Sequence, residues 1–104
     1  MAGDYRVRLT RQALDDIQEI QDFIGRNSPQ NAARMIERLF AAFDSLESFP
    51  HRTIVELLSE RLNYPVRSLP VKPYVVYFRV IGAEKAVVVR HIRHGARRPP
   101  ETLE

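Results

Sequence analysis

Residues 74–92 read YVVYFRVIGAEKAVVVRHI, and this stretch decides the fold class. It contains two runs rich in valine and aromatic residues, 74–80 and 86–92, joined by residues 81–85, which include Gly82. Valine and aromatic residues favour strands, and a short joint that contains glycine favours a tight turn. We therefore predict that the two runs are antiparallel strands of one hairpin, and that the protein contains a β-sheet.

The region before this hairpin predicts one more strand. It also contains a short segment whose secondary structure the sequence does not decide. Residues 66–69 have the composition of a strand and lie between prolines, which are tolerated at strand ends and edges. Residues 51–65 are less regular. Within them, the largely apolar residues 54–58 fit either a strand or a short helical turn, because so short a run has no decisive periodicity.

The N-terminal half predicts a strand followed by two amphipathic helices. Residues 5–9 alternate apolar residues with arginines, which is the period-two pattern of a strand with one buried face. Thr10 and Ser28 are expected to cap the two helices, and Pro29 suits the first position of the second helix. The apolar residues at helical spacing are Ala13, Ile17, Ile20 and Ile24 in the first helix and Ala32, Ile36, Leu39, Phe43 and Leu46 in the second.

The two helices are expected to form an antiparallel hairpin, because the connection between them is only a few residues long. Phe49-Pro50 ends the second helix. We interpret Phe40, Phe43 and Phe49 as core residues. Together the elements predict an α+β fold of order β-α-α-β-β-β, in which a helical hairpin packs on one face of a small antiparallel sheet.

Length and composition predict a soluble protein of one domain, residues 1–104, with residues 99–104 as a flexible tail. A hydrophobic fraction of 44% and a charged fraction of 28% are typical of globular chains. The absence of cysteine excludes disulfides, thiol catalysis and cysteine metal sites. No apolar run approaches the length of a membrane span, so we expect a cytoplasmic protein that does not bind membranes.

The charge is distributed unevenly along the chain. Residues 61–98 carry nine arginines and lysines and one acidic residue, whereas residues 1–60 carry seven basic and ten acidic residues. A surface ion-pair network explains such a segment poorly, because its cations repel one another unless a partner neutralises them. We therefore predict that the C-terminal segment binds an anionic partner. Arginine pairs with phosphate and with carboxylate, so nucleic acid and an acidic peptide both remain open.

Several short motifs follow one another in a fixed order. They are Tyr5-Arg6-Val7-Arg8-Leu9-Thr10, Ala13, Asp16-Ile17, Phe23-Ile24, Ser28-Pro29, Ala32, Phe49-Pro50, Glu56-Leu57, Val66-Arg67-Ser68-Leu69, Tyr74-Val75-Val76-Tyr77-Phe78-Arg79-Val80 and His94-Gly95-Ala96-Arg97. In this combination, over nearly the whole chain, they resemble the ParE/RelE superfamily of toxins from bacterial type II toxin-antitoxin modules. The resemblance implies a helical hairpin on a small sheet, an antitoxin partner, growth arrest and a role in plasmid stabilisation.

The resemblance implies one of two activities. RelE-like members cut mRNA on the ribosome with clustered lysines or arginines, a base such as glutamate, and a tyrosine or histidine near the C-terminus. ParE-like members inhibit DNA gyrase without being nucleases. Here the region has only Lys72 and Lys85, and no tyrosine follows Tyr77. We therefore favour a ParE-like toxin that is not an enzyme. A nuclease that uses Arg67, Arg93 and His94 is the alternative, and a degenerate toxin that only binds its antitoxin is a third.

The same reasoning assigns candidate site residues. We expect the target to contact the end of the last strand, through Arg90, Arg93, His94 and Arg97. We expect a ParD-like antitoxin to bind as a hetero-oligomer, through an acidic amphipathic C-terminal segment, at Arg67, Arg79, Tyr77, Ile24 and Ile36. His94 is interpreted as hydrogen-bonded to a local carbonyl, and Gly95 as the residue of a sharp turn. Since His51 has no companion ligands nearby, we predict no metal site and no cofactor.

Overall fold

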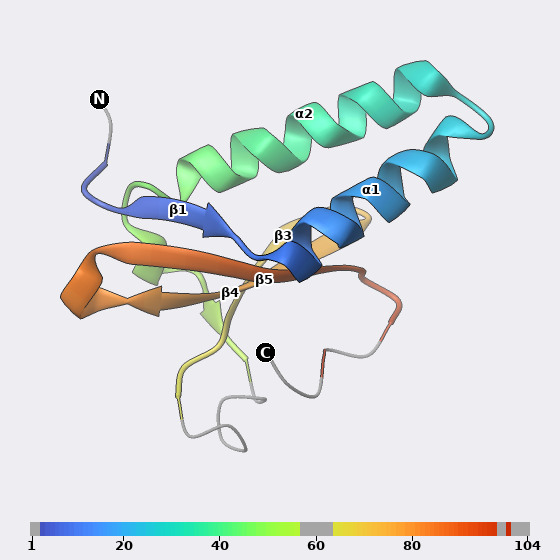
Figure 1. Ribbon diagram of the computed structural model, residues 1–104. Coiled ribbons are helices and arrows are strands. Elements are labelled where there is room, and N and C mark those ends of the chain that lie inside the picture. The colour runs from blue at the N-terminus through green and yellow to red at the C-terminus, as the bar shows by residue number, and fades with distance from the viewer. Residues whose placement is uncertain (1–2, 57–63, 98–99, 101–104) are drawn as a thin grey trace.

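A computed structural model describes residues 3–56, 64–97 and 100, and shows two helices on one face of a sheet (Figure 1). The elements in chain order are β1 (Arg6–Leu9), α1 (Arg11–Gly25), α2 (Pro29–Ser45), a 3-10 turn (Pro50–Arg52), β2 (Ile54–Val55), β3 (Arg67–Val71), β4 (Tyr74–Ile81), a second 3-10 turn (Gly82–Glu84) and β5 (Ala86–His94). The predicted α+β class and the helical hairpin on a small sheet are confirmed.

The sheet is mixed, which corrects the expectation of a purely antiparallel one. Its strand order is β1-β5-β4-β3-β2, and β1 pairs with β5 in parallel while the other pairs are antiparallel. Two parallel strands need a long connection between them. Here the connection from β1 to β5 begins with the helical hairpin. Of the open segment at residues 54–58, residues 54–55 form a strand and residues 57–58 lie outside the described part of the chain.

Both predicted helix caps are confirmed. The Thr10 hydroxyl oxygen accepts a hydrogen bond from the Ala13 amide at 3.1 Å, and the Ser28 hydroxyl oxygen accepts one from the Asn31 amide at 3.1 Å. Each hydroxyl satisfies an amide that has no partner within its helix. The apolar stripes then pack against the sheet. The buried residues of this core are Ala13, Ile17, Ile20, Met35, Leu39, Phe43, Leu46, Val71, Tyr74, Val76, Phe78, Val87, Val89 and Ile92.

Two of the three phenylalanines interpreted as core residues are exposed. Phe43 is buried, but Phe40 is 43% exposed and Phe49 is 81% exposed. Phe40 follows Leu39 directly, and one residue rotates a helical side chain by about 100°, away from the buried stripe. Phe49 lies beyond the end of α2 with a left-handed backbone (φ 50°), which directs its side chain away from the core.

The turn between β4 and β5 differs in detail from the prediction. Gly82 begins a 3-10 turn, but the residue with positive φ is Lys85, at 52°. The backbone at Gly82 is open, since an added Cβ would meet no atom within 4 Å. The turn therefore requires a left-handed residue at position 85 and tolerates any side chain at 82.

β5 extends past the end of β1, and α1 covers the edge of β5 that β1 leaves unpaired. The last β1 residue is Leu9, opposite Val89, so β5 continues past the end of its neighbour. The Thr10 amide donates to Val89 O at 3.1 Å. Further along, the Ile92 amide donates to Asp16 Oδ2 at 2.9 Å. Gln12 Nε2 holds the same carboxylate by donating to Asp16 Oδ1 at 2.8 Å. A buried side chain thus replaces the missing strand.

We expect Asp16→Ala to lower the free energy of unfolding by about 1–3 kcal/mol, because it leaves the buried Ile92 amide without an acceptor. The matched control is Asp15→Ala. Asp15 is exposed and forms only an i,i+4 ion pair with Arg11 at 3.5 Å, so its loss should cost about 0.5 kcal/mol or less. Urea unfolding measures both values. Equal losses for the two variants would contradict the role of Asp16 at this edge.

Candidate functional site

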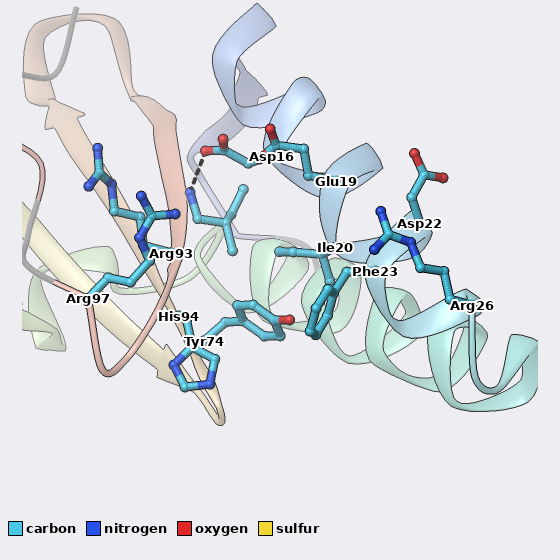
Figure 2. Close-up of a pocket in the computed structure, with 11 residues that line it drawn as sticks. Asp16, Glu19, Ile20, Asp22, Phe23, Arg26, Tyr74, Arg93, His94 and Arg97 are labelled. Atoms are coloured by element: carbon cyan, nitrogen blue, oxygen red, sulfur yellow. Dashed lines mark hydrogen bonds between the residues drawn. The ribbon is translucent and has the colours of Figure 1, made fainter.

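An open recess lies between α1 and the C-terminal end of β5 (Figure 2). Its volume is about 490 Å³. The residues that line it are Asp16, Glu19, Ile20, Asp22, Phe23, Arg26, Tyr74, Ile92, Arg93, His94 and Arg97. The Asp16 hydrogen bond to Ile92 joins its two walls, so the contact that closes the sheet edge also fixes the width of the recess.

The α1 wall is mainly acidic, with one basic residue, Arg26, at its end, and the opposite wall is basic. Glu19 and Asp22 are exposed on the α1 wall, whereas Arg93 and Arg97 stand on the β5 wall. Phe23 lies on the rim and is 66% exposed. Exposed aromatic residues and arginines are both enriched in protein interfaces, so the recess is a candidate docking surface.

The chain turns sharply after His94, and close backbone packing explains the glycine that follows. The Gly95 amide donates to Pro73 O at 2.7 Å, and an added Cβ would lie 3.2 Å from that oxygen. Gly95 does not have positive φ, so close approach, rather than an unusual backbone angle, favours glycine here. The turn closes with the Arg97 amide donating to His94 O at 2.9 Å. It brings Arg97 back to the recess.

His94 makes local contacts, although not the predicted one. Its Nδ1 accepts a hydrogen bond from the Ala96 amide at 3.1 Å, where we expected a bond to a carbonyl. Its ring also meets the Tyr74 ring edge-on, with centroids 5.6 Å apart. Since the Ala96 amide occupies Nδ1, Nε2 is the ring nitrogen that remains to face a partner.

The structure brings together three of the four residues predicted to contact the target. Arg93, His94 and Arg97 share the recess. Arg90 does not line it, and lies instead beside Arg8 in a separate recess on the sheet.

The three residues of the nuclease alternative do not converge. Arg67 Nη1 donates to the carbonyl oxygens of His51 and Thr53 at 3.0 and 2.9 Å, so it secures the segment before β2. Arg67 pairs with Phe78 at one end of the β3-β4 hairpin, whereas His94 pairs with Tyr74 at the other end of β4. The two positions are four residues apart along β4, or about 13 Å at the rise of a strand, which separates Arg67 from the recess.

The five residues predicted to bind the antitoxin are also dispersed. Ile24 of α1 and Ile36 of α2 are partly buried, and both pack against the main core. Tyr77 is buried in a second small cluster, with Val66, on the other face of the sheet. Arg79 stacks on the Tyr64 ring at 4.1 Å, and Arg67 is engaged as described. These side chains do not form one continuous surface.

A polar cluster on the sheet face away from the helices was missed by the sequence analysis. Ser68 Oγ donates to Glu56 Oε2 at 2.7 Å, and Ser68 is the cross-strand neighbour of Tyr77. Burial and the Glu56 carboxylate raise the pKa of the Tyr77 phenol, while Arg93 opposes the shift. Glu56 was part of the motif Glu56-Leu57, but nothing in its spacing linked it to a strand 21 positions later. The pairing of β2 with β3, and of β3 with β4, places it there.

Asp16 was missed for a different reason. It lies within the apolar stripe of α1, next to Ile17, and is only 8% exposed. An acid in a buried stripe is a signal in itself, because a buried carboxylate requires donors. One donor, Gln12, lies four positions away on the same helix, but the other, the Ile92 amide on a strand 76 residues away, is not visible in the sequence.

In the described part of the chain, no group of three or more histidines, cysteines and acids is placed to hold a metal ion. None of the helices there is long and apolar enough to cross a bilayer.

Residues 7–99 match the family described as ParE toxin of type II toxin-antitoxin system, parDE. The chain belongs to the ParE toxin family. It is a type II toxin of the ParE/RelE superfamily. The toxin RelE2 of Caulobacter vibrioides is 39% identical to this toxin over 88 residues, which cover 85% of this chain and 92% of that relative.

Two solved structures share the fold of this ParE-family toxin. The chromosomal ParDE system of P. aeruginosa contains a chain that superposes with a TM-score of 0.69 at 20% identity, covering 88% of this toxin and 96% of that chain. The toxin-antitoxin complex RelBE2 of Mycobacterium tuberculosis contains one with a TM-score of 0.59 at 22% identity, covering 88% and 98%. At these identities the likeness establishes the shared fold.

The raised pKa of Tyr77 predicts a pH effect on stability. Burial raises the pKa above the value of about 10 for a free phenol, because the neutral form fits the packed site better. The stabilisation is complete below about pH 10 and is lost as pH rises through the folded pKa. As the pH rises above about 10, we expect the melting temperature of Tyr77→Phe to fall less than that of the unsubstituted toxin. Parallel melting curves for the two proteins would contradict this assignment.

Proposed function

We propose that this toxin inhibits DNA gyrase by binding it, without catalysing a reaction. The observation that carries the proposal is the recess between α1 and β5, where Arg93, His94 and Arg97 line one side and the exposed Phe23 lies on the other. These groups are presented at the surface, as recognition by a large partner requires. The family description, which names parDE, supports the same branch.

We propose that a ParD-like antitoxin neutralises the toxin in a hetero-oligomer. The P. aeruginosa and M. tuberculosis neighbours belong to toxin-antitoxin assemblies, which supports a partner of this kind. An acidic amphipathic C-terminal segment would match the β5 wall of the recess, because its carboxylates pair with arginines and its apolar side chains cover Phe23. Salt then weakens the complex without abolishing it, since apolar burial is not screened.

We expect Arg97→Glu and Arg93→Glu to abolish growth arrest and inhibition of gyrase supercoiling, because each reverses a charge on the β5 wall. The control is Arg34→Glu on the exposed face of α2, which should retain full activity. Exposed substitutions change stability by about 0.5 kcal/mol or less, so the melting temperature of Arg97→Glu should remain close to that of the unsubstituted toxin. If both β5 variants remain fully toxic and folded, the target contacts another surface.

A second candidate function is ribosome-dependent cleavage of mRNA, and the cluster of Glu56, Ser68 and Tyr77 favours it. RNA cleavage through the ribose hydroxyl needs a base and a cation that stabilises the developing charge. Glu56 is a carboxylate on the sheet face away from the helices, and Arg93 lies close enough to influence the same phenol. The RelE2 name of the Caulobacter relative points the same way.

Glu56→Gln separates the two candidates while preserving the local structure, because the amide oxygen still accepts from Ser68 Oγ. If the toxin inhibits gyrase, Glu56→Gln keeps growth arrest and supercoiling inhibition, and neither protein cuts mRNA on ribosomes. Cleavage by the unsubstituted toxin that disappears in Glu56→Gln would establish the nuclease function. A toxin that binds its antitoxin but arrests no growth when expressed alone would support the third alternative, a protein that retains only antitoxin binding.

A further inference from the structure

A second, smaller recess lies where the end of β1 meets β5 and the start of α1. Its volume is about 320 Å³, and the residues that line it are Arg8, Leu9, Thr10, Val88 and Arg90. Arg8 and Val88 are paired neighbours on adjacent strands. Both charged residues of this lining are arginines, and none of its residues lines the larger recess between α1 and β5.

The Arg90 guanidinium is incompletely paired. Its Nε atom is buried and has no hydrogen-bond partner in the described part of the chain. Arginine cannot lose its proton at any ordinary pH, so a buried guanidinium N–H needs an acceptor. Arg8 contributes a second guanidinium, and its contact with Glu84, at 3.9 Å between two exposed side chains, is long and weak.

The start of α1 adds further donors. Thr10 lines the recess and caps this helix of 15 residues. The Leu14 amide donates the first backbone hydrogen bond of the helix, to Thr10 O. The Thr10 hydroxyl oxygen accepts a hydrogen bond from the Ala13 amide. The amides of Arg11 and Gln12 precede both bonds and point out of the N-terminal end. The first turn contains no acidic residue to offset the positive end of the helix dipole.

We propose that this recess binds a phosphate group, held by Arg8 and Arg90 from two adjacent strands beside the positive N-terminal end of α1. A tetrahedral phosphate accepts hydrogen bonds from several directions at once, which matches guanidinium donors that come from both β1 and β5. A carboxylate offers only two acceptor oxygens in one plane, whereas a phosphate presents three or more in a tetrahedral arrangement. The phosphate is either free inorganic phosphate or part of a nucleic-acid backbone. The inference does not depend on whether the toxin acts on gyrase or on mRNA.

The test is a titration of ¹⁵N-labelled toxin followed by NMR. Inorganic phosphate is one ligand, a short oligothymidylate without terminal phosphate is the other, and sodium chloride at matched ionic strength is the reference. Saturable shifts are expected at the Nε–H signal of Arg90 and at the backbone amides of Arg11 and Gln12. Arg90→Gln and Arg8→Gln should each weaken binding by roughly tenfold or more, because each removes charge-assisted hydrogen bonds.

The matched control is Arg6→Gln, an exposed arginine on the same strand that does not line the recess. It should weaken binding clearly less than Arg8→Gln does, because it removes only the screened attraction of a neighbouring charge and no hydrogen bond. Arg90→Lys retains the charge and loses the planar fork, so weak binding by this variant supports recognition by the guanidinium. Saturation by phosphate identifies the free ion, and saturation by the oligonucleotide alone identifies backbone phosphate. Shifts that match those of chloride, or equal weakening by Arg6→Gln, would overturn the proposal.

Discussion

The fold depends on how the exposed edge of β5 is satisfied. β1 pairs with only the first part of this strand, and the remaining backbone groups lie at the centre of a small protein, where an unpaired amide costs free energy. Thr10 and Asp16 meet this requirement from α1, one through its backbone amide and hydroxyl and the other through its carboxylate. The first helix is therefore bonded to the sheet at two points, in addition to packing against it.

These two attachments also determine where the polar surfaces lie. The Asp16 bond sets the end of β5 against α1, which places the acidic wall of one element opposite the basic wall of the other. The Thr10 bonds fix the start of the helix beside the strand pair that carries Arg8 and Arg90. Structural residues that are not themselves exposed thus position both recesses.

The sequence predicted the elements better than the contacts between them. Helical spacing and the capping residues Thr10 and Ser28 identified both helices, and valine-rich runs identified β4 and β5, because these signals are local. The parallel pairing of β1 with β5 has no local signal, and neither has the bond between Asp16 and Ile92.

The candidate site was predicted in part for the same reason. Arg93, His94 and Arg97 were found together because they are close in the chain. The Glu56 cluster was missed because strand pairing alone brings it to Tyr77. Phe40 and Phe49 show a further limit, since a shift of one residue on a helix or a left-handed backbone angle decides whether an aromatic ring is buried.

The position of β5 in the sheet has a consequence for synthesis of the toxin. β5, the strand that joins β1 to β4, is the last of the described strands, so residues 6–9 find their partner only after residues 86–89 have been translated. Until then α1 cannot bond to β5, and the core lacks Val87, Val89 and Ile92. Contacts so distant in sequence form late and slowly. A nascent chain on the ribosome therefore has neither recess until β5 has been translated and has paired with β1.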